Sequence, residues 1–238
     1  MKKDRTELFQ AVFLPKPFAK RVKKFFIFPI ILLLTACSPS LYSIHVKYEP
    51  SKDTAKPSVA PLEQVVTVAA FNDARPEGDD LLIGHVIKSR GRRIPVIPKK
   101  NKLSQAVSES IKNYLRQTGY AVSDNAPTWD SKEDTLRKEW GRIVVGGNID
   151  QVELICKDDI PIKRYHAEVK LTVFFADTQK GKIFYTVSAT GKTSLEHIRF
   201  SEEILGQQFN GALSATIEDI FRGDAVRSKI RDIIGHVP

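Results

Sequence analysis

An apolar stretch without charged residues near the N-terminus, residues 25–36 (FFIFPIILLLTA), determines where the rest of the chain can fold. It directly follows a basic segment that contains Lys20, Arg21, Lys23 and Lys24. A basic segment, a short apolar segment and small residues before a cleavage point are the three parts of a secretory signal peptide. The stretch is well short of the roughly 20 residues that span a bilayer, and Pro29 interrupts it. We therefore expect residues 1–36 to be removed and the remaining chain to fold outside the cytoplasm.

The stretch ends in Leu34-Thr35-Ala36-Cys37, which resembles the lipobox of bacterial lipoproteins. In that family the cysteine thiol is lipidated and the cysteine becomes the new N-terminus. The resemblance implies that Cys37 carries the lipid anchor, and two or more acyl chains hold a protein stably in a bilayer. Ser38 follows; because the family's sorting rules retain proteins at the inner membrane mainly when Asp stands there, the outer membrane is implied, with the folded part facing the periplasm. The alternative is an uncleaved N-terminal membrane helix, which leaves the remaining chain on the same side.

Most of the positive charge belongs to the expected signal peptide. The sequence has a net charge of +9, but residues 1–36 contain eight of the 37 basic residues and two of the 28 acidic ones. The remainder therefore carries a net charge of +3, which does not indicate a nucleic-acid partner. With Cys37 lipidated, Cys156 has no partner for an intrachain disulfide, so we expect the fold to rest on its hydrophobic core.

The first half of the remaining chain predicts strands around a linker. Residues 42–48 alternate apolar and polar side chains, which is typical of a half-buried strand, and residues 50–61 form a Pro/Ser-rich linker without periodicity. Residues 65–71 (VVTVAAF) are nearly all apolar and predict a central strand buried on both faces. We expect residues 37–63 to hold the lipidated cysteine, a tether, the first strand and the linker. Residues 64–238 are expected to form a single periplasmic α+β domain.

A hairpin and a helix are predicted next. The two arms of the hairpin are predicted at residues 81–87 and 93–97, around a turn at residues 89–92 in which Gly91 is the turn residue. Because Pro95 and Pro98 cannot donate ladder hydrogen bonds, the second arm is predicted at a sheet edge.

Apolar residues recur every fourth position over residues 104–118, which predicts a helix, and Gly119 follows as its left-handed cap. A short strand is expected at residues 120–122. The polar segment 125–141, which contains Trp129 and Trp140, is expected to hold a helical turn capped by Ser131.

The C-terminal half predicts a three-stranded meander followed by helices. Its strands are expected at residues 142–156, 165–175 and 183–189, and a change of apolar parity near residues 147–151 indicates a β-bulge. Ser201 is expected to cap a second amphipathic helix, and a short final helix follows. The predicted fold class is α+β: a two-layer sandwich in which a mixed or antiparallel sheet carries the two main amphipathic helices on one face.

Several short motifs accompany this order of elements: the lipobox, a Val-rich strand that runs into Asp73-Ala74-Arg75-Pro76, then Ile83-Gly84, and a helix that closes in Thr118-Gly119-Tyr120. Together they resemble the YajG-like family of bacterial outer-membrane lipoproteins. The order of elements is also similar to a domain of outer-membrane lipoproteins that activate peptidoglycan synthases or accompany curli and other secretion systems. The family has no established catalytic residues, so the resemblance implies a protein that is not an enzyme.

Motifs for catalysis, metals or cofactors are weak. Gly191-Lys192-Thr193 imitates the end of a phosphate loop, but Thr186 occupies the position of the required first glycine. The histidines show no metal-ligand spacing, so solvated side chains and no metal site are predicted for His45, His85, His166, His197 and His236. No cofactor is predicted.

Two further groups of polar residues have structural explanations. Cys156 shares its strand parity with Val152 and Leu154, which favours a core thiol over a reactive one. Asp73 and Arg75 follow the central strand, where sites often form, but we favour a structural role for them, as a turn-forming Asp and a pairing Arg that hold the exit of the strand.

One segment stands above this background. Between residues 88 and 102 the chain carries seven basic residues and no acidic one: Lys88, Arg90, Arg92, Arg93, Lys99, Lys100 and Lys102. A solvated loop is one interpretation. The other is a cationic finger that contacts an anionic envelope surface, such as lipid head groups, lipopolysaccharide phosphates or peptidoglycan carboxylates.

Three hypotheses of function follow. The first is a non-catalytic lipoprotein that binds another envelope protein, as an assembly factor or accessory subunit. The second is a binder of anionic glycan or lipid (peptidoglycan or lipopolysaccharide) that uses the basic hairpin and Trp129 or Trp140. The third is an enzyme, for which the sequence offers no nucleophile motif such as a GxSxG elbow.

Overall fold

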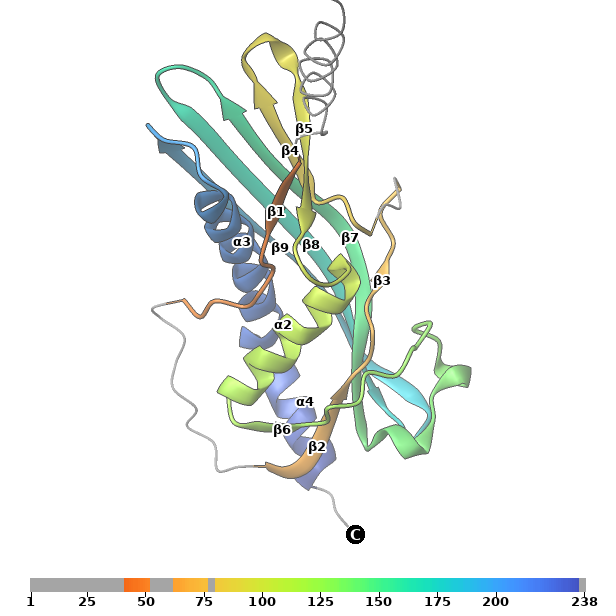
Figure 1. The fold of residues 1–238 in the computed structure, drawn as a ribbon. Coiled ribbons are helices and arrows are strands. Elements are labelled where there is room, and N and C mark those ends of the chain that lie inside the picture. The colour runs from red at the N-terminus through yellow and green to blue at the C-terminus, as the bar shows by residue number, and fades with distance from the viewer. Residues whose placement is uncertain (1–40, 52–61, 77–79, 236–238) are drawn as a thin grey trace, which may run out of the picture. The chain divides into compact units, whose positions relative to one another are not determined.

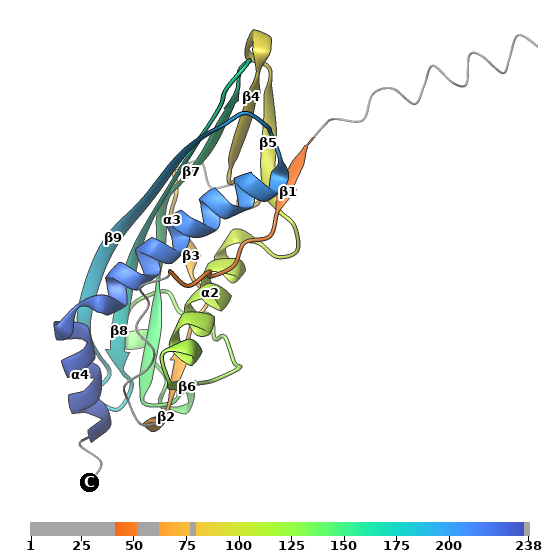
Figure 2. The ribbon, with the colours of Figure 1, turned by 90° about the vertical axis from the view of Figure 1, so that its left-hand side faces the viewer.

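The computed structural model describes residues 41–51, 62–76 and 80–235, all within one compact unit. Cys37 and the expected signal peptide lie outside the described residues. The described chain forms a nine-stranded mixed sheet with helices packed on one face (Figures 1 and 2). The predicted α+β class and its two-layer arrangement are therefore confirmed.

The elements have the following bounds. The strands are β1 (Tyr42–Ile44), β2 (Leu62–Val68), β3 (Asn72–Asp73), β4 (Gly84–Lys88), β5 (Arg93–Pro98), β6 (Tyr120–Val122), β7 (Ile143–Asp158), β8 (Lys163–Asp177) and β9 (Lys182–His197). The helices are α2 (Leu103–Gln117), α3 (Glu202–Arg222) and α4 (Asp224–Gly235), with 3₁₀ turns η2 (Ser89–Gly91), η3 (Glu133–Thr135) and η4 (Lys138–Trp140).

The sheet is assembled on β7. One edge of β7 pairs with antiparallel β8 along its whole length, and β8 pairs in turn with antiparallel β9. The other edge pairs successively with three parallel strands, β2, β3 and β4. Strand β6 lies beyond β2, and β5 followed by β1 lies beyond β4. The predicted central position of the strand at residues 65–71 is confirmed, because β2 lies between β6 and β7.

The predicted bulge in β7 is confirmed. The pairing of β7 with β8 shifts register between Ile149 and Gln151. Val145 and Ile149 before the shift, and Leu154 and Cys156 after it, all belong to the core beneath the helices. The extra residue at the bulge changes which alternate side chains face the helices. Apolar residues on both sides of the bulge therefore pack into the same core.

Helix α3 lies against β8 and β9, and α2 lies against β2, β3 and β6 (Figure 2). Ser201 caps α3 as predicted, since its hydroxyl accepts a hydrogen bond from the Ile204 N–H. Gly191 lies inside β9 where α3 approaches closely: a Cβ there would come 2.2 Å from the Ala212 carbonyl oxygen. The sequence Gly191-Lys192-Thr193 is therefore a packing contact within a strand and not a phosphate loop.

The opposite face of the sheet carries a second, smaller core. Trp129 packs there with Ala69, Val144 and Ala176, and Gly146 provides room for the indole, because a Cβ at that position would lie 2.6 Å from its ring. Segment 125–141 contains helical turns as expected, but the predicted cap at Ser131 is wrong. Two 3₁₀ turns, η3 and η4, lie there, and Ser131 has a positive φ of 63° rather than the extended conformation of an N-cap residue.

The first strand is shorter than predicted. β1 ends at Ile44, and the backbone N–H groups of Lys47, Glu49 and Ser51 bond to side chains of α3 instead of to a neighbouring strand. Their acceptors are Asn210, Ser214 and Glu218, all buried polar residues of α3. Residues 45–51 therefore lie as a strap along α3.

The predicted edge position of β5 is wrong, because β1 pairs with it in parallel. This pairing starts at Val96, where Tyr42 is its partner, one residue past Pro95. The Val96 carbonyl accepts from the Ile83 N–H on the β4 side, so the nitrogen of Pro95 points to the outer side, before β1 begins. The missing donor thus costs the sheet no ladder hydrogen bond.

Candidate functional site

The basic segment forms the predicted hairpin. Strands β4 and β5 pair antiparallel, with Ile87 opposite Arg93, and η2 closes the turn. Arg90 and Gly91 both have a φ of 76°, so the turn uses the left-handed conformation that was expected of Gly91.

The seven basic residues do not form one patch. Arg90, Arg92 and Arg93 are exposed at the hairpin tip; we call this set the tip cluster. Lys99, Lys100 and Lys102 are exposed between β5 and α2; we call this set the base cluster. Arg93 is the first residue of β5 and Lys99 follows its last, so the five residues between them separate the two sets by about 20 Å at the usual rise of a strand. The basic residues therefore form two separate clusters and not one continuous patch, because the half-buried strand β5 lies between them.

Lys88 belongs to neither cluster. Its ammonium lies 2.5 Å from an Asp158 carboxylate oxygen, 4.6 Å from the centre of the Phe200 ring and 5.5 Å from that of Tyr42. Lys163 pairs with the same carboxylate at 3.0 Å. Burial has the largest single effect and would lower the pKa of Lys88, but the interactions with Asp158 and Tyr42 together outweigh it and raise that pKa. Lys88 thus joins β4, β7 and the start of β1 and serves the fold.

Asp80, an acidic neighbour of the basic segment, caps the N-terminus of helix α2. Its carboxylate accepts hydrogen bonds from both the N–H and the hydroxyl of Ser104. The helix therefore begins at Leu103 with a cap supplied from an earlier loop, while Lys102 at the N-cap position makes no side-chain cap.

Strand register brings three chain segments to the end of the sheet that carries the tip cluster. Lys88 is level with Asp158, and Lys163 is level with both Asp158 and His197. The hairpin tip, the β7–β8 turn and the end of β9 consequently lie side by side (Figure 1). Ile160 and Ile198 at this end are 86% and 70% exposed, more than any other large apolar side chain of the described residues.

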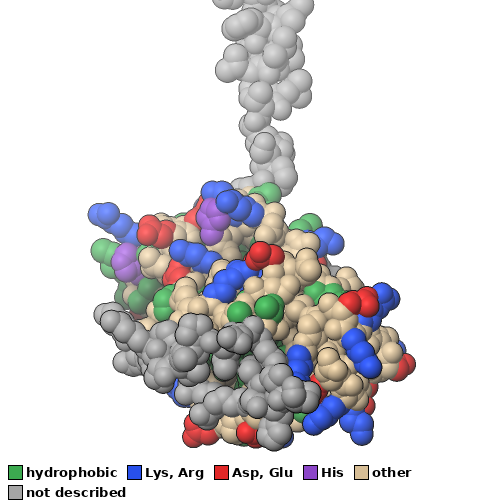
Figure 3. Space-filling view, turned by 90° about the horizontal axis from the view of Figure 1, so that it is seen from below, with side chains coloured by type: hydrophobic (Ala, Val, Ile, Leu, Met, Phe, Trp, Pro, Cys, Tyr) green, Lys and Arg blue, Asp and Glu red, His purple; other side chains and the backbone are tan. Residues whose placement is uncertain are grey.

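The described chain enters the sheet from the tip side, but beside the middle of β5, where Tyr42 is level with Val96, three residues from both Arg93 and Lys99. β1 runs parallel to β5, and β5 runs away from the tip, so the start of β1 is its tip-side end. Leu41, which precedes β1, is half exposed. Cys37 lies outside the described residues, but only three residues separate it from Leu41, so the chain between the two can span at most about 14 Å. By contrast, acidic and basic side chains are interspersed on the end of the molecule seen from below (Figure 3).

The Asp73–Arg75 pair is structural in this fold. Arg75 donates to both carboxylate oxygens of Asp73, at 2.8 and 2.6 Å, and to the Leu82 carbonyl at 2.7 Å. The hydrogen bond from Arg75 lowers the pKa of Asp73 although burial opposes it. The pair fixes the exit of β3 to the loop that leads into β4.

Two other candidates are resolved by burial. The Cys156 thiol is fully buried and free, and burial raises its pKa to about 11, so the predicted core thiol is confirmed. Trp129 is 1% exposed and its indole N–H donates to the Lys132 carbonyl, so it is not available as a glycan-binding platform. Trp140 is half-buried, and the guanidinium of Arg137 lies over its ring at 6.0 Å.

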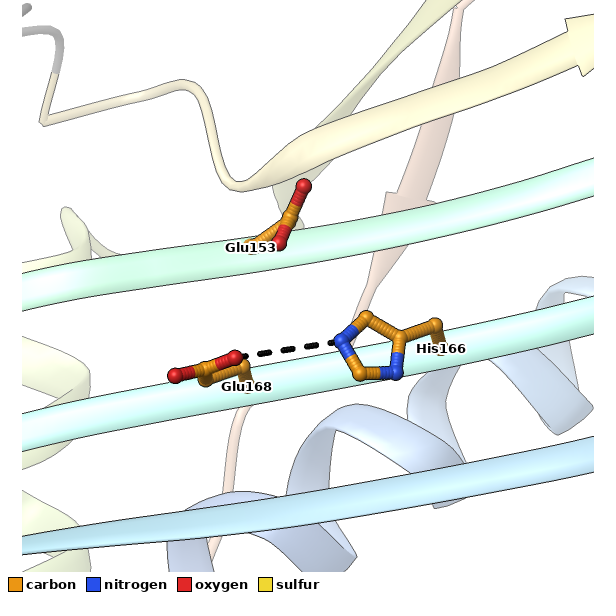
Figure 4. Close-up of side chains that lie close together, drawn as sticks. All are labelled: Glu153, His166 and Glu168. Carbon is orange, nitrogen blue, oxygen red and sulfur yellow. Dashed lines mark ion pairs between the residues drawn. The ribbon is translucent and has the colours of Figure 1, made fainter.

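The sequence did not indicate a cluster of Glu153, His166 and Glu168 on the face of the sheet away from α2 and α3 (Figure 4). One ligand atom from each residue lies within 4.8 Å of the others. A groove of about 530 Å³ along β4 and β7 reaches Glu153 and is also lined by His85, Ile87 and Ile155. The only local signal was the spacing of His166 and Glu168 on the polar side of one strand, because the position of Glu153 depends on the pairing register.

No protein-family model and no curated protein sequence matches this chain. Its fold is similar to that of solved structures. Protein XCC0632 from Xanthomonas campestris, of the family model DUF330, aligns with a TM-score of 0.50 and 12% identity over 81% of this chain and 98% of that one. Bacterial lipoproteins are also among the similar structures. Lipoprotein GNA1162 from Neisseria meningitidis has a TM-score of 0.38 and 12% identity over 67% of this chain and 99% of that one.

The LpoB C-terminal domain from Salmonella enterica has a TM-score of 0.29 and 12% identity over 59% of this chain and 87% of that one. At these identities the similarity to protein XCC0632 shows a common fold alone. Within residues 41–51, 62–76 and 80–235, no helix combines the length and apolarity needed to cross a membrane.

The Lys88–Asp158 pair gives a pH-dependent prediction. Hydrogen bonds from Lys88 and Lys163 outweigh burial and lower the pKa of Asp158. Its contribution is therefore fully present above the unfolded pKa of about 3.9 and is lost as the pH falls through the lower folded value. We expect Asp158→Asn to lower the free energy of unfolding by about 2 kcal/mol at pH 7. In urea denaturation this difference should shrink below about pH 4.

Asp159→Asn is the matched control, because its carboxylate is half exposed and pairs with Arg164 only at 3.6 Å. An exposed pair of this kind contributes about 0–1 kcal/mol. An Asp158→Asn effect of equal size at pH 3 and pH 7 would contradict the account of this pair.

Proposed function

We propose that this chain is a non-catalytic lipoprotein of the bacterial envelope, anchored in the outer membrane by lipids on Cys37. Its folded part faces the periplasm and binds another envelope protein, as an assembly factor or accessory subunit. The observation that carries the proposal is the sequence Leu34-Thr35-Ala36-Cys37, placed after a short apolar segment and only a few residues before β1. Membership of the YajG-like family is part of the same proposal.

The use of the buried polar groups supports a non-catalytic role. Asp73 and Arg75 hold a loop, and Lys88 pairs with Asp158. Asn210 and Glu218 of α3 accept hydrogen bonds from the strap at residues 45–51. Each of these groups has a partner whose loss would disturb the fold, so none is held ready for a substrate. A stoichiometric protein partner recovered from membranes by crosslinking would identify the component that the domain serves.

The anchor is tested by Cys37→Ser. Without the thiol no acyl chain can be attached, so we expect this variant to lose labelling by radioactive palmitate and to keep the size of the unprocessed precursor. Cys156→Ser is the matched control and should label and mature like the wild type, because its thiol is buried. Normal processing and membrane retention of Cys37→Ser would refute lipid anchoring.

A second function is favoured by the position of the tip cluster. We propose that Arg90, Arg92 and Arg93 contact anionic groups at the membrane surface, either phospholipid head groups or lipopolysaccharide phosphates. β1 enters the sheet from the tip side, and exposed Ile160 and Ile198 lie at the tip end of the sheet. A lipid on Cys37 would therefore hold this end close to the bilayer, where each basic side chain contributes about 1 kcal/mol.

Two triple variants with equal loss of charge test this contact. Arg90→Ser, Arg92→Ser and Arg93→Ser together remove the tip cluster, while Lys99→Ser, Lys100→Ser and Lys102→Ser remove the base cluster. In flotation with anionic vesicles, protein that begins at Ser38 should lose at least about tenfold in binding with the first triple and little with the second. The loss should vanish at high salt. Equal effects of both triples would rule out a specific role for the tip.

A further inference from the structure

The register of β7 and β8 places two carboxylates face to face. Glu153 on β7 is directly opposite Glu168 on β8, and both side chains project from the face away from α2 and α3 (Figure 4). His166 lies two residues before Glu168, so it shares that face. All three residues are partly buried. Two glutamates and one imidazole therefore meet in a half-buried position on rigid strands.

Among the described residues, only one lysine or arginine, Lys192, forms an ion pair with either of these two carboxylates. Like charges directly opposite in an antiparallel pair destabilise a sheet. Lys192 on β9 partly offsets Glu168, since its ammonium lies 3.0 Å from a carboxylate oxygen. The Glu153 carboxylate forms no ion pair or hydrogen bond with any residue that the structure describes. The cluster is stabilised if a further cation lies between the two carboxylates.

The imidazole is oriented for such a cation. Nδ1 of His166 lies 3.2 Å from the Ser194 hydroxyl, and Ser194 is its direct partner on β9. An Nδ1–H donated to that hydroxyl leaves the lone pair on Nε2, which lies 3.9 Å from Glu168. Metal-binding histidines are commonly fixed in this way through the ring nitrogen that does not bind the metal.

We propose that Glu153, His166 and Glu168 bind a divalent transition-metal ion, with zinc as the ion that this donor set fits best. One imidazole nitrogen and two carboxylate oxygens are zinc ligands, whereas magnesium and calcium prefer oxygen ligands alone. Ligand atoms around tetrahedral zinc are separated by about 3.3 Å. The present spacing of up to 4.8 Å therefore requires only small side-chain rotations. A fourth position stays open to water or to a ligand from a partner.

Titration calorimetry with zinc chloride tests the site in the full-length protein, purified in detergent. We expect one zinc ion per chain with a dissociation constant in the micromolar range, and no heat of binding with magnesium chloride. His166→Ala and Glu153→Gln should each weaken zinc binding at least tenfold. His45→Ala is the matched control, because this exposed histidine lies on the strap and far from β8 in the chain. Zinc binding that is absent from the wild type, or unchanged in His166→Ala, would overturn the proposal.

A thermal readout separates loss of the site from loss of the fold. Glu153→Gln removes one of two facing charges, so without metal its melting temperature should equal or exceed that of the wild type. Zinc should raise the melting temperature of the wild type but not of Glu153→Gln, since only a binding-competent native state gains stability from a ligand. An equal rise in both proteins would show that zinc binds elsewhere and would exclude this cluster.

Discussion

The rest of the structure depends on the pairing of β7 at both of its edges. Its sixteen residues pair with β8 on one side and with β2, β3 and β4 on the other. The bulge between Ile149 and Gln151 allows this one strand to point apolar side chains at the helices along its whole length. Before the bulge, the alternate residues Val144 and Gly146 face the small core around Trp129. After it, Glu153 is exposed to the groove instead.

The two proposed activities follow from that register. Parallel β4 and antiparallel β8 and β9 bring the tip cluster, the β7–β8 turn and the end of β9 to one end of the sheet. The same ladders place Glu153 opposite Glu168 on the middle of the face away from α2 and α3. A membrane-facing end and a metal-binding face can therefore act independently, because the sheet separates them along its strands.

Local patterns in the sequence predicted local structure. Helix α2, the cap at Ser201, the hairpin and the bulge were all predicted, because each depends on residues close together in the chain. Features that depend on residues far apart in the chain could not be predicted from local patterns. Strand β5 is covered by β1 from far upstream, the strap bonds to α3 from more than 150 residues away, and Glu153 meets Glu168 only through the ladder. The tip and base clusters are neighbours in sequence. Only the structure shows that the half-buried strand β5 separates them into two surfaces.

The central claim is that the end of the sheet with the hairpin tip faces the membrane. Depth-dependent quenching by brominated lipids tests it directly, with a fluorophore on Ser89→Cys at the tip or on Lys180→Cys in the β8–β9 turn at the opposite end. Buried Cys156, with its raised pKa, should stay unlabelled. In the lipidated protein on vesicles, the account predicts strong quenching at position 89 and little at position 180. Equal quenching, or stronger quenching at position 180, would contradict it.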